Sequence, residues 1–149
     1  MTTDKAFVDT NILLRTIITQ MDQHVESEAL VQQMWADKVE LWISRQVIRE
    51  YLVQITHPRT FDPPLEIEQV MEHLTQVEGL FRVADDTQAV TAHLKTLLQT
   101  VPTRGKQIHD ANIVATMRAN AIDTLLTLNY DDFRRFEDQI TILAPDTTP

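Results

Sequence analysis

The chain has 149 residues, 43% of them hydrophobic, and carries a formal net charge of −9 with no cysteine. This length predicts a single domain with a sizeable core, and the lack of cysteine excludes disulfides, thiolate metal sites and cysteine nucleophiles. Two glycines are too few for a glycine-rich phosphate loop, and no apolar run approaches the ~20 residues that span a bilayer. The first residues also lack the features of a signal peptide. We therefore expect a cytoplasmic protein that does not enter a membrane.

Short strand-like segments alternate with longer helical patterns along the chain. We expect strands at residues 5–8, 40–43, 80–83, 124–128 and 139–143. Helices are expected directly after the first strand and over residues 22–36, 45–55, 65–77, 89–98 and 108–117. This alternation predicts an α/β fold with a short, mostly parallel central sheet of four to five strands. We expect one domain over residues 1–144 and a polar tail over 145–149.

Asp9 stands between the first expected strand and the first expected helix, in the segment Phe7-Val8-Asp9-Thr10-Asn11. In open α/β sheets, ligands bind beyond the carboxyl ends of the strands, which is where Asp9 would lie. A carboxylate in such a crevice needs a hydrogen bond, an ion pair or a cation. Asp9 can also simply cap the helix that follows. Three side chains of the capping type stand where one would serve, and this excess favours a site.

Two further acids, Asp110 and Asp132, occupy comparable positions, and Glu50 would complete the set. Asp110 lies in the first turn of a helix, Asp132 lies just beyond a strand, and Glu50 lies at the edge of an apolar helix face. If the first and fourth strands are neighbours, these acids converge at one edge of the sheet. Clustered carboxylates repel one another unless they are protonated or neutralised by a hard cation such as Mg²⁺ or Mn²⁺. Such a cation generates hydroxide from bound water for phosphodiester cleavage.

Other charged residues along the chain have expected roles in the fold or in binding. Asp85 and Asp86 precede a helical pattern, so we expect one of them to cap that helix and the other to complement its dipole. The net charge counts against a nucleic-acid ligand, although the four clustered acids account for part of it and local basic residues can still contact phosphates. The basic residues near the expected site segments are Arg15, Arg45, Arg49, Arg104, Lys106, Arg134 and Arg135.

In order and spacing, these segments resemble the PIN domain, and more narrowly the VapC-type toxin ribonucleases. The resemblance covers nearly the whole chain and rests on Val8-Asp9-Thr10-Asn11, Glu50, Ile108-His109-Asp110-Ala111 and the segment 127–133. It implies a three-layer α/β/α fold and an endoribonuclease dependent on Mg²⁺ or Mn²⁺. The residues that it implies as metal-binding, catalytic acids are Asp9, Glu50, Asp110 and Asp132. The supporting polar residues would be Thr10, Asn11, Thr127 and Asn129.

The chain departs from the family pattern at Asn129. Many family members carry a further acid at this position, whereas an amide contributes no charge. Which of Asn129, Asp131 and Asp132 faces the metal is therefore open. We favour Asp132, because it directly precedes Phe133, whose ring would anchor the loop.

The resemblance also implies partners. A VapC-type ribonuclease is the toxin of a type II toxin–antitoxin pair, so we expect an RNA substrate and a cognate antitoxin protein. Apolar stripes over residues 65–77 and 25–35 favour a homodimer. Two alternatives remain: an aspartate-dependent phosphatase with Asp9 as phosphoryl acceptor, and a catalytically inactive RNA-binding PIN relative. The phosphatase alternative is weakened by Asn11, which stands where such enzymes commonly have a second acid.

Overall fold

A five-stranded parallel sheet forms the centre of the molecule. The computed structural model describes residues 4–145, so positions 146–149 of the expected tail lie outside the described residues. The strands are β1 (Lys5–Val8), β2 (Glu40–Ser44), β3 (Arg82–Ala84), β4 (Thr124–Leu126) and β5 (Thr141–Leu143). They lie in the order β3-β2-β1-β4-β5, and every neighbouring pair is parallel.

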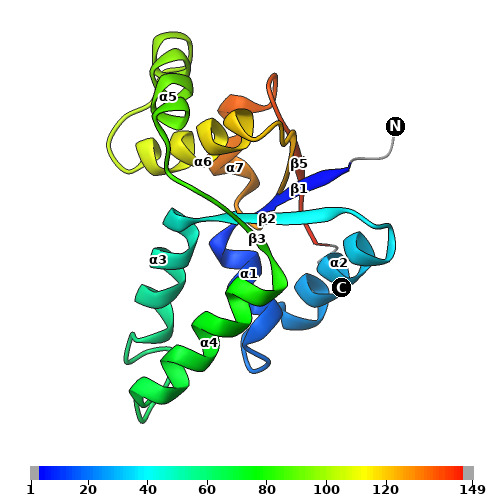
Figure 1. Cartoon of the computed structure of the whole chain (residues 1–149), viewed down its shortest axis with the longest axis vertical. Coiled ribbons are helices and arrows are strands. Elements are labelled where there is room, and N and C mark those ends of the chain that lie inside the picture. Colours follow the sequence, from blue (N-terminus) through cyan, green and yellow to red (C-terminus); the bar gives the residue numbers. More distant parts are fainter. Residues whose placement is uncertain (1–3, 146–149) are drawn as a thin grey trace.

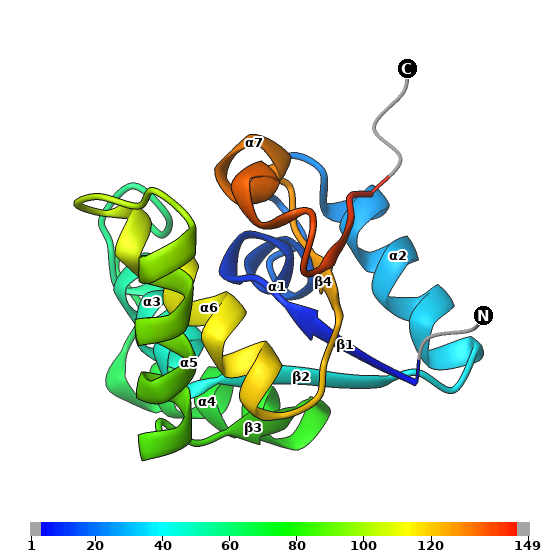
Figure 2. The ribbon, with the colours of Figure 1, turned by 90° about the horizontal axis from the view of Figure 1, so that it is seen from above.

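Helices cover both faces of this sheet. They are α1 (Thr10–Ile17), α2 (His24–Ala36), α3 (Arg45–Ile55), α4 (Ile67–Leu80), α5 (Gln88–Thr100), α6 (Gln107–Ala119) and α7 (Tyr130–Phe133), which continues into a 3₁₀ turn at Arg134–Phe136. In Figure 1, α1 to α4 lie below the sheet and α5 to α7 lie above it, and Figure 2 gives the view from above. The predicted three-layer α/β/α architecture is therefore confirmed.

Strand β1 is the central strand of the sheet, and three of its four residues are buried. Ala6, Phe7 and Val8 are fully inaccessible to solvent, as expected for an apolar strand covered on both faces. Ala6 lies opposite Leu41 of β2 and Thr124 of β4. The chain runs outward from β1 through β2 to β3, and then crosses the sheet to β4. The first and fourth strands are thus neighbours, and the point where the strand order reverses, at which α/β proteins bind ligands, lies between them.

Four of the five expected strands differ from the observed ones at their ends: β2 ends one residue later than expected, β5 begins two residues later, and β3 and β4 also differ. Helix α4 continues to Leu80, so β3 begins two residues later than expected. The reason is Phe81, which is buried between helix and strand with its ring 5.8 Å from that of Trp35. Strand β4 ends at Leu126: the N–H of Thr127 still donates to the carbonyl of Leu143 in β5, but the next N–H, that of Leu128, donates to the Asn11 side chain.

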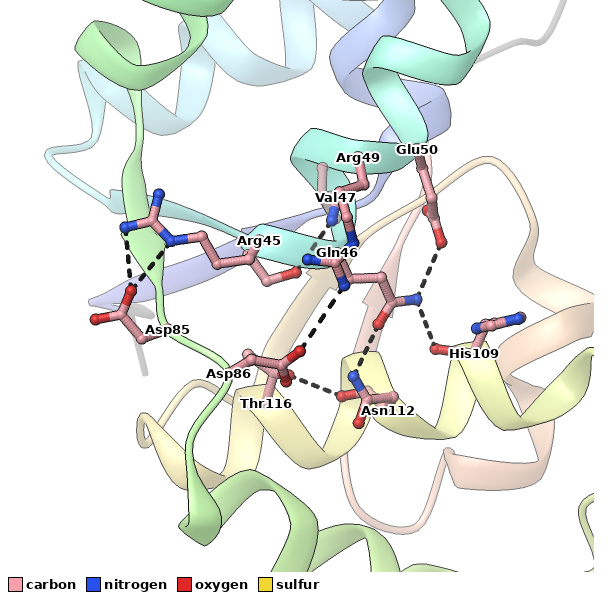
Figure 3. Close-up of polar contacts among 11 residues, drawn as sticks. Arg45, Gln46, Val47, Arg49, Glu50, Asp85, Asp86, His109, Asn112 and Thr116 are labelled. Atoms are coloured by element: carbon pink, nitrogen blue, oxygen red, sulfur yellow. Dashed lines mark hydrogen bonds and ion pairs between the residues drawn. The ribbon is translucent and has the colours of Figure 1, made fainter.

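The prediction that Asp85 or Asp86 caps α5 is wrong. The N-cap of α5 is Thr87, whose hydroxyl oxygen accepts a hydrogen bond from the backbone of Val90. The two aspartates instead pair with the first turns of α3: Asp85 with Arg45 at 3.1 Å and Asp86 with Arg49 at 3.8 Å (Figure 3). The parallel pairing of β2 and β3 brings their carboxyl ends together, and α3 starts at the end of β2. Asp85 and Asp86 therefore form ion pairs with a different helix instead of capping the helix that follows them.

Within residues 4–145, no helix is both long and apolar enough to cross a membrane.

Candidate active site

A cavity of about 380 Å³ opens beside the carboxyl end of β1. Three of the four predicted acids line it: Asp9 at the end of β1, Glu50 on α3 and Asp110 in the first turn of α6. The fourth, Asp132, is exposed on α7 and does not line the cavity, whereas Asn129 does. Phe133 is buried as expected. Residues far apart in the sequence thus converge where the strand order reverses.

Asp9 is almost completely buried and serves both as a helix cap and as a cavity wall. It is 6% exposed, and its Oδ1 accepts a 2.8 Å hydrogen bond from the backbone N–H of Thr10. Its Oδ2 accepts from the hydroxyl of Thr127 at 2.8 Å and from Nδ2 of Asn11 at 3.2 Å. These donors come from the start of α1 and from the end of β4. Asp9 is therefore hydrogen-bonded on both sides of the point where the strand order reverses, the topological switch point of the sheet.

Asn11 and Thr127 link this carboxylate to the loop that follows β4. The Asn11 amide also donates to the Thr127 hydroxyl at 3.3 Å, and its carbonyl accepts from the N–H of Leu128 at 3.1 Å. The N–H of Asn129 donates to the Thr127 hydroxyl at 3.0 Å. The polar residues expected to support the site are therefore part of one hydrogen-bonded group around Asp9.

Glu50 is half-buried and is held by two neutral donors. Its Oε2 accepts from the hydroxyl of Thr10 at 2.7 Å, and its Oε1 accepts from Nε2 of Gln46 at 3.0 Å. Thr10 follows Asp9 directly, so the hydroxyl fixes the second acid relative to the first. None of these contacts neutralises the carboxylate.

Burial and mutual repulsion disfavour the ionised forms of the cavity acids. Burial raises the pKa of Asp9 to about 6, with a smaller contribution from the charge of Glu50, although hydrogen bonds from Thr127 and Thr10 oppose it. Burial also raises the pKa of Asp110 to about 6, and the charges of Asp132 and Asp9 add to the effect. Asp132 therefore affects the pKa of Asp110 although it does not line the cavity. The cavity therefore concentrates negative charge, which the charge of Arg135 offsets only in part.

The raised pKa values predict that the protein without metal loses stability as pH rises. Both folded-state pKa values, about 6, lie above the ordinary 3.8, so the folded state binds more protons between these values and stability falls as pH increases. For Asp9 we expect a loss on the order of 1–3 kcal/mol between pH 4 and 7.5. Thermal melts in chelator across this range measure it, with Asp9→Asn as the control that removes the Asp9 contribution. A wild-type pH profile identical to that of Asp9→Asn would contradict the assignment.

The donor set of the cavity fits a hard divalent cation. Carboxylate oxygens are the ligands that Mg²⁺ and Mn²⁺ prefer, and the raised pKa values indicate charge that a cation would relieve. Across residues 4–145, no three acidic or histidine side chains lie close enough together to enclose a metal as they stand. Mg²⁺ does not require such a cage, because it usually keeps several waters and binds through one or two carboxylates.

The candidate RNA-binding residues differ in position. Arg15 lines the cavity; its Nη1 donates to the carbonyl of Asn11 at 3.0 Å, and its Nε is buried without a hydrogen-bond partner in the described part of the chain. Arg49 pairs with Asp86 on the surface. The remaining candidates are exposed around the loop before α6 and on the turn after α7: Arg104, Lys106 and Arg134.

Gln46 is a residue of the site that the sequence did not predict. This side chain is 7% exposed and bonds to Glu50, to the carbonyl of His109 and to Asn112. A signal was present, because Gln46 precedes Glu50 by four residues and therefore lies on the same helix face. The ring of His109 is exposed, and only its backbone carbonyl takes part in this network.

The fold and site define a class: a three-layer parallel α/β protein with an acidic cavity at its topological switch point. Residues 6–139 match the family model of the PIN domain, which is most of the chain. The chain belongs to the PIN-domain family, and the resemblance inferred from the sequence is confirmed at this level.

Named relatives are similar over most of the chain. Ribonuclease VapC48 of Mycobacterium tuberculosis is 26% identical over 131 residues, which cover 87% of this chain and 90% of the relative. VapBC2 from Rickettsia felis, solved with a DNA fragment from its promoter, superposes with a TM-score of 0.68 at 19% identity, covering 95% and 99% of the two chains. VapC20 of Mycobacterium tuberculosis, a toxin that cleaves the sarcin–ricin loop, gives 0.62 at 17% identity, covering 87% and 93%. At these identities the solved structures support the fold.

Proposed function

We propose that this protein is a metal-dependent endoribonuclease and the toxin of a type II toxin–antitoxin pair. The observation that carries the proposal is the convergence of Asp9, Glu50 and Asp110 on one cavity at the switch point of a PIN fold. The names of similar proteins, a VapC ribonuclease and a toxin that cleaves RNA, support the same activity. We place such a protein in the cytoplasm, where its RNA substrate lies.

In this proposal Asp9 and Asp110 hold Mg²⁺ or Mn²⁺, with Glu50 completing the set and Asp132 adding negative charge from outside the cavity. The ion, when bound, activates water and stabilises the charge that develops on the phosphate. The hydrogen bonds to Asp9 from Thr127 and Asn11 orient its carboxylate toward one position. Burial keeps bulk water from screening these charges.

Arg15 is the basic residue best placed to meet the substrate. It lines the same cavity as the acids, and no ion pair joins it to any of them within residues 4–145. Its guanidinium therefore keeps donors for a phosphate oxygen. Four further basic residues would contact the RNA backbone further from the cavity: Arg49, Arg104, Lys106 and Arg134.

The phosphatase alternative is not favoured. Both carboxylate oxygens of Asp9 already accept hydrogen bonds, which reduces their strength as nucleophiles, and Asn11 stands in place of a second acid. A catalytically inactive relative is not favoured either, because the cavity retains three acids.

RNA cleavage with and without metal tests the proposed activity. Purified protein is incubated with a mixture of structured RNAs in Mg²⁺ or Mn²⁺ and in chelator. We expect cleavage with metal and none in chelator, because hydroxide formation depends on the ion. Equal cleavage in the two conditions would rule out the mechanism. Using a mixture of RNAs ensures that selectivity for one sequence does not hide the activity.

We also propose a homodimer and an inhibitory antitoxin that binds near the acidic cavity. Several large apolar side chains remain exposed on helices that lie together on one face of the sheet: Val25 on α2, Val53 on α3, and Ile67 and Met71 on α4. Ile67 and Met71 lie four residues apart and are therefore neighbours on α4, and contiguous exposed apolar surface is typical of protein interfaces.

The homodimer predicts a specific result in solution. Light scattering at micromolar concentration should give twice the chain mass of 17.2 kDa. Ile67→Asp with Met71→Asp should convert the dimer to a monomer without lowering the melting temperature by more than a few degrees, because both side chains are exposed. A wild-type monomer at this concentration would refute the dimer.

A further inference from the structure

Gln46 is a buried polar side chain that joins α3 to α6 beside the acidic cavity. It is 7% exposed and lies among buried apolar positions of α3, including Val47 and Ile48. A carboxamide in such a place is costly to bury unless its donors and acceptor are paired. Both polar atoms of the Gln46 amide are hydrogen-bonded; one partner is the cavity acid Glu50, and another is the backbone carbonyl of His109, which precedes the cavity acid Asp110.

The contacts fix the orientation of the amide. Nε2 of Gln46 donates to Oε1 of Glu50 and to the carbonyl of His109, both at 3.0 Å, and its Oε1 accepts from Nδ2 of Asn112 at 2.9 Å (Figure 3). Carboxylate and carbonyl oxygens only accept, so the nitrogen of Gln46 must face them. Within α6, the backbone carbonyl of Asn112 in turn accepts from the hydroxyl of Thr116 at 2.8 Å.

These contacts relate the acids to one another. Glu50 is held through one oxygen by Gln46 and through the other by Thr10, which follows Asp9 in the chain. The other acceptor of the Gln46 amide is the carbonyl of His109, which precedes Asp110. We infer that Gln46 is a positioning residue that holds the Glu50 carboxylate at a set distance from the first turn of α6, so that Glu50 and Asp110 face one metal site. This inference rests on the proposed function.

A neutral amide suits this role for an electrostatic reason. A lysine or arginine at position 46 would also orient Glu50, but its charge would neutralise the carboxylate and repel a divalent cation. The amide gives two directed hydrogen bonds and leaves the negative charge of Glu50 available. Residues that hydrogen-bond to metal ligands typically change metal affinity or activity by about 10–100-fold when they are replaced.

The test is Gln46→Met, which keeps the length of the side chain and removes the hydrogen bonds. We expect the Kd for Mn²⁺, measured by titration without RNA, to rise by about tenfold or more. We expect kcat for RNA cleavage to fall while KM for RNA stays unchanged, because Gln46 does not line the cavity. Gln33→Met is the matched control, because Gln33 makes the same type of bond to an acid four residues on, Asp37 at 3.0 Å, at an exposed site on α2.

A double-mutant cycle separates positioning from general destabilisation. If Gln46 acts through Glu50, Gln46→Met should change Mn²⁺ affinity little in a Glu50→Gln background. Equal fold-changes in the two backgrounds would overturn the inference. Should Gln46→Met fail to fold, Asn112→Ala provides the same test, because it removes the donor to Oε1 of Gln46 and should weaken Mn²⁺ binding in the same direction.

The outcomes distinguish this inference from the proposed function. Wild-type protein that neither binds Mn²⁺ nor cleaves RNA would overturn the proposed function, and the inference with it. Wild-type protein that binds Mn²⁺ while Gln46→Met or Asn112→Ala binds it equally well would overturn the role of Gln46 alone.

Discussion

Asp9→Asn should lower the rate of RNA cleavage by about 100- to 1,000-fold, the effect of losing several kcal/mol of transition-state stabilisation from a bound metal. Asp9 is the most deeply buried of the cavity acids and is held from both β1–α1 and the end of β4. The amide is nearly isosteric but carries no charge, so it cannot replace a carboxylate as a ligand for a hard cation. Initial rates on a mixture of structured RNAs in Mn²⁺ measure the loss.

The loss should not come from unfolding. In chelator, removing the Asp9 charge relieves its burial cost and its repulsion of Glu50, which offsets the altered hydrogen bonds with Thr127 and Asn11. Asp9→Asn should therefore melt no earlier than wild type at pH 7.5. Asp85→Asn is the control and should cleave at the wild-type rate, because Asp85 is exposed and paired with Arg45 away from the cavity. Wild-type cleavage by Asp9→Asn would show that Asp9 does not act in catalysis.

Mn²⁺ should stabilise the wild-type protein strongly and Asp9→Asn much less. A ligand that binds only the folded state adds RT ln(1 + [L]/Kd), about 2.7 kcal/mol at a hundredfold excess over Kd. For a chain of this size, that increment raises the melting temperature by roughly 5–10 °C. The cavity supplies the reason, since a cation there offsets the burial cost and the mutual repulsion that raise the pKa values of Asp9 and Asp110.

The melts compare wild type, Asp9→Asn and Asp85→Asn, each in chelator and in Mn²⁺. Asp85→Asn should keep the full shift, because its carboxylate contacts Arg45 rather than the cavity. If Asp9→Asn kept the full shift as well, Asp9 would not be a ligand. For each protein, the melting temperature in Mn²⁺ is compared with its own melting temperature in chelator. The difference therefore excludes any effect of the substitution on the stability of the metal-free protein.

The features that sequence could predict are those that local pattern determines. An apolar run followed by Asp9 and an amphipathic helix specifies a strand end and a helix start, and the alternation of strands with helices specifies a parallel sheet. The convergence of Asp9 and Asp110 then required only that β1 and β4 be neighbours, as they are. The family resemblance added Glu50, whose place at the edge of a helix face is otherwise ordinary.

The features that sequence missed depend on contacts between distant segments. Capping rules predicted local roles for Asp85 and Asp86, but α3 presents Arg45 and Arg49 to them across the carboxyl edge of the sheet. The role of Gln46 likewise depends on how α3 lies against α6, which no local pattern specifies. The sequence showed that Asp132 is an acid just beyond a strand, but it did not show how far this acid lies from the cavity. In the structure Asp132 is exposed on α7, and its charge still raises the pKa of Asp110.

The most direct test of the central claim, that the cavity acids form a metal centre, is a Mn²⁺ titration followed by electron paramagnetic resonance, in which only free Mn²⁺ gives the sharp signal. We expect wild type and Asp85→Asn to remove Mn²⁺ from solution with the same Kd, and Asp9→Asn and Asp110→Asn to bind it at least about tenfold more weakly, a cost of about 1.4 kcal/mol or more. Equal Mn²⁺ binding by all four proteins would contradict the account.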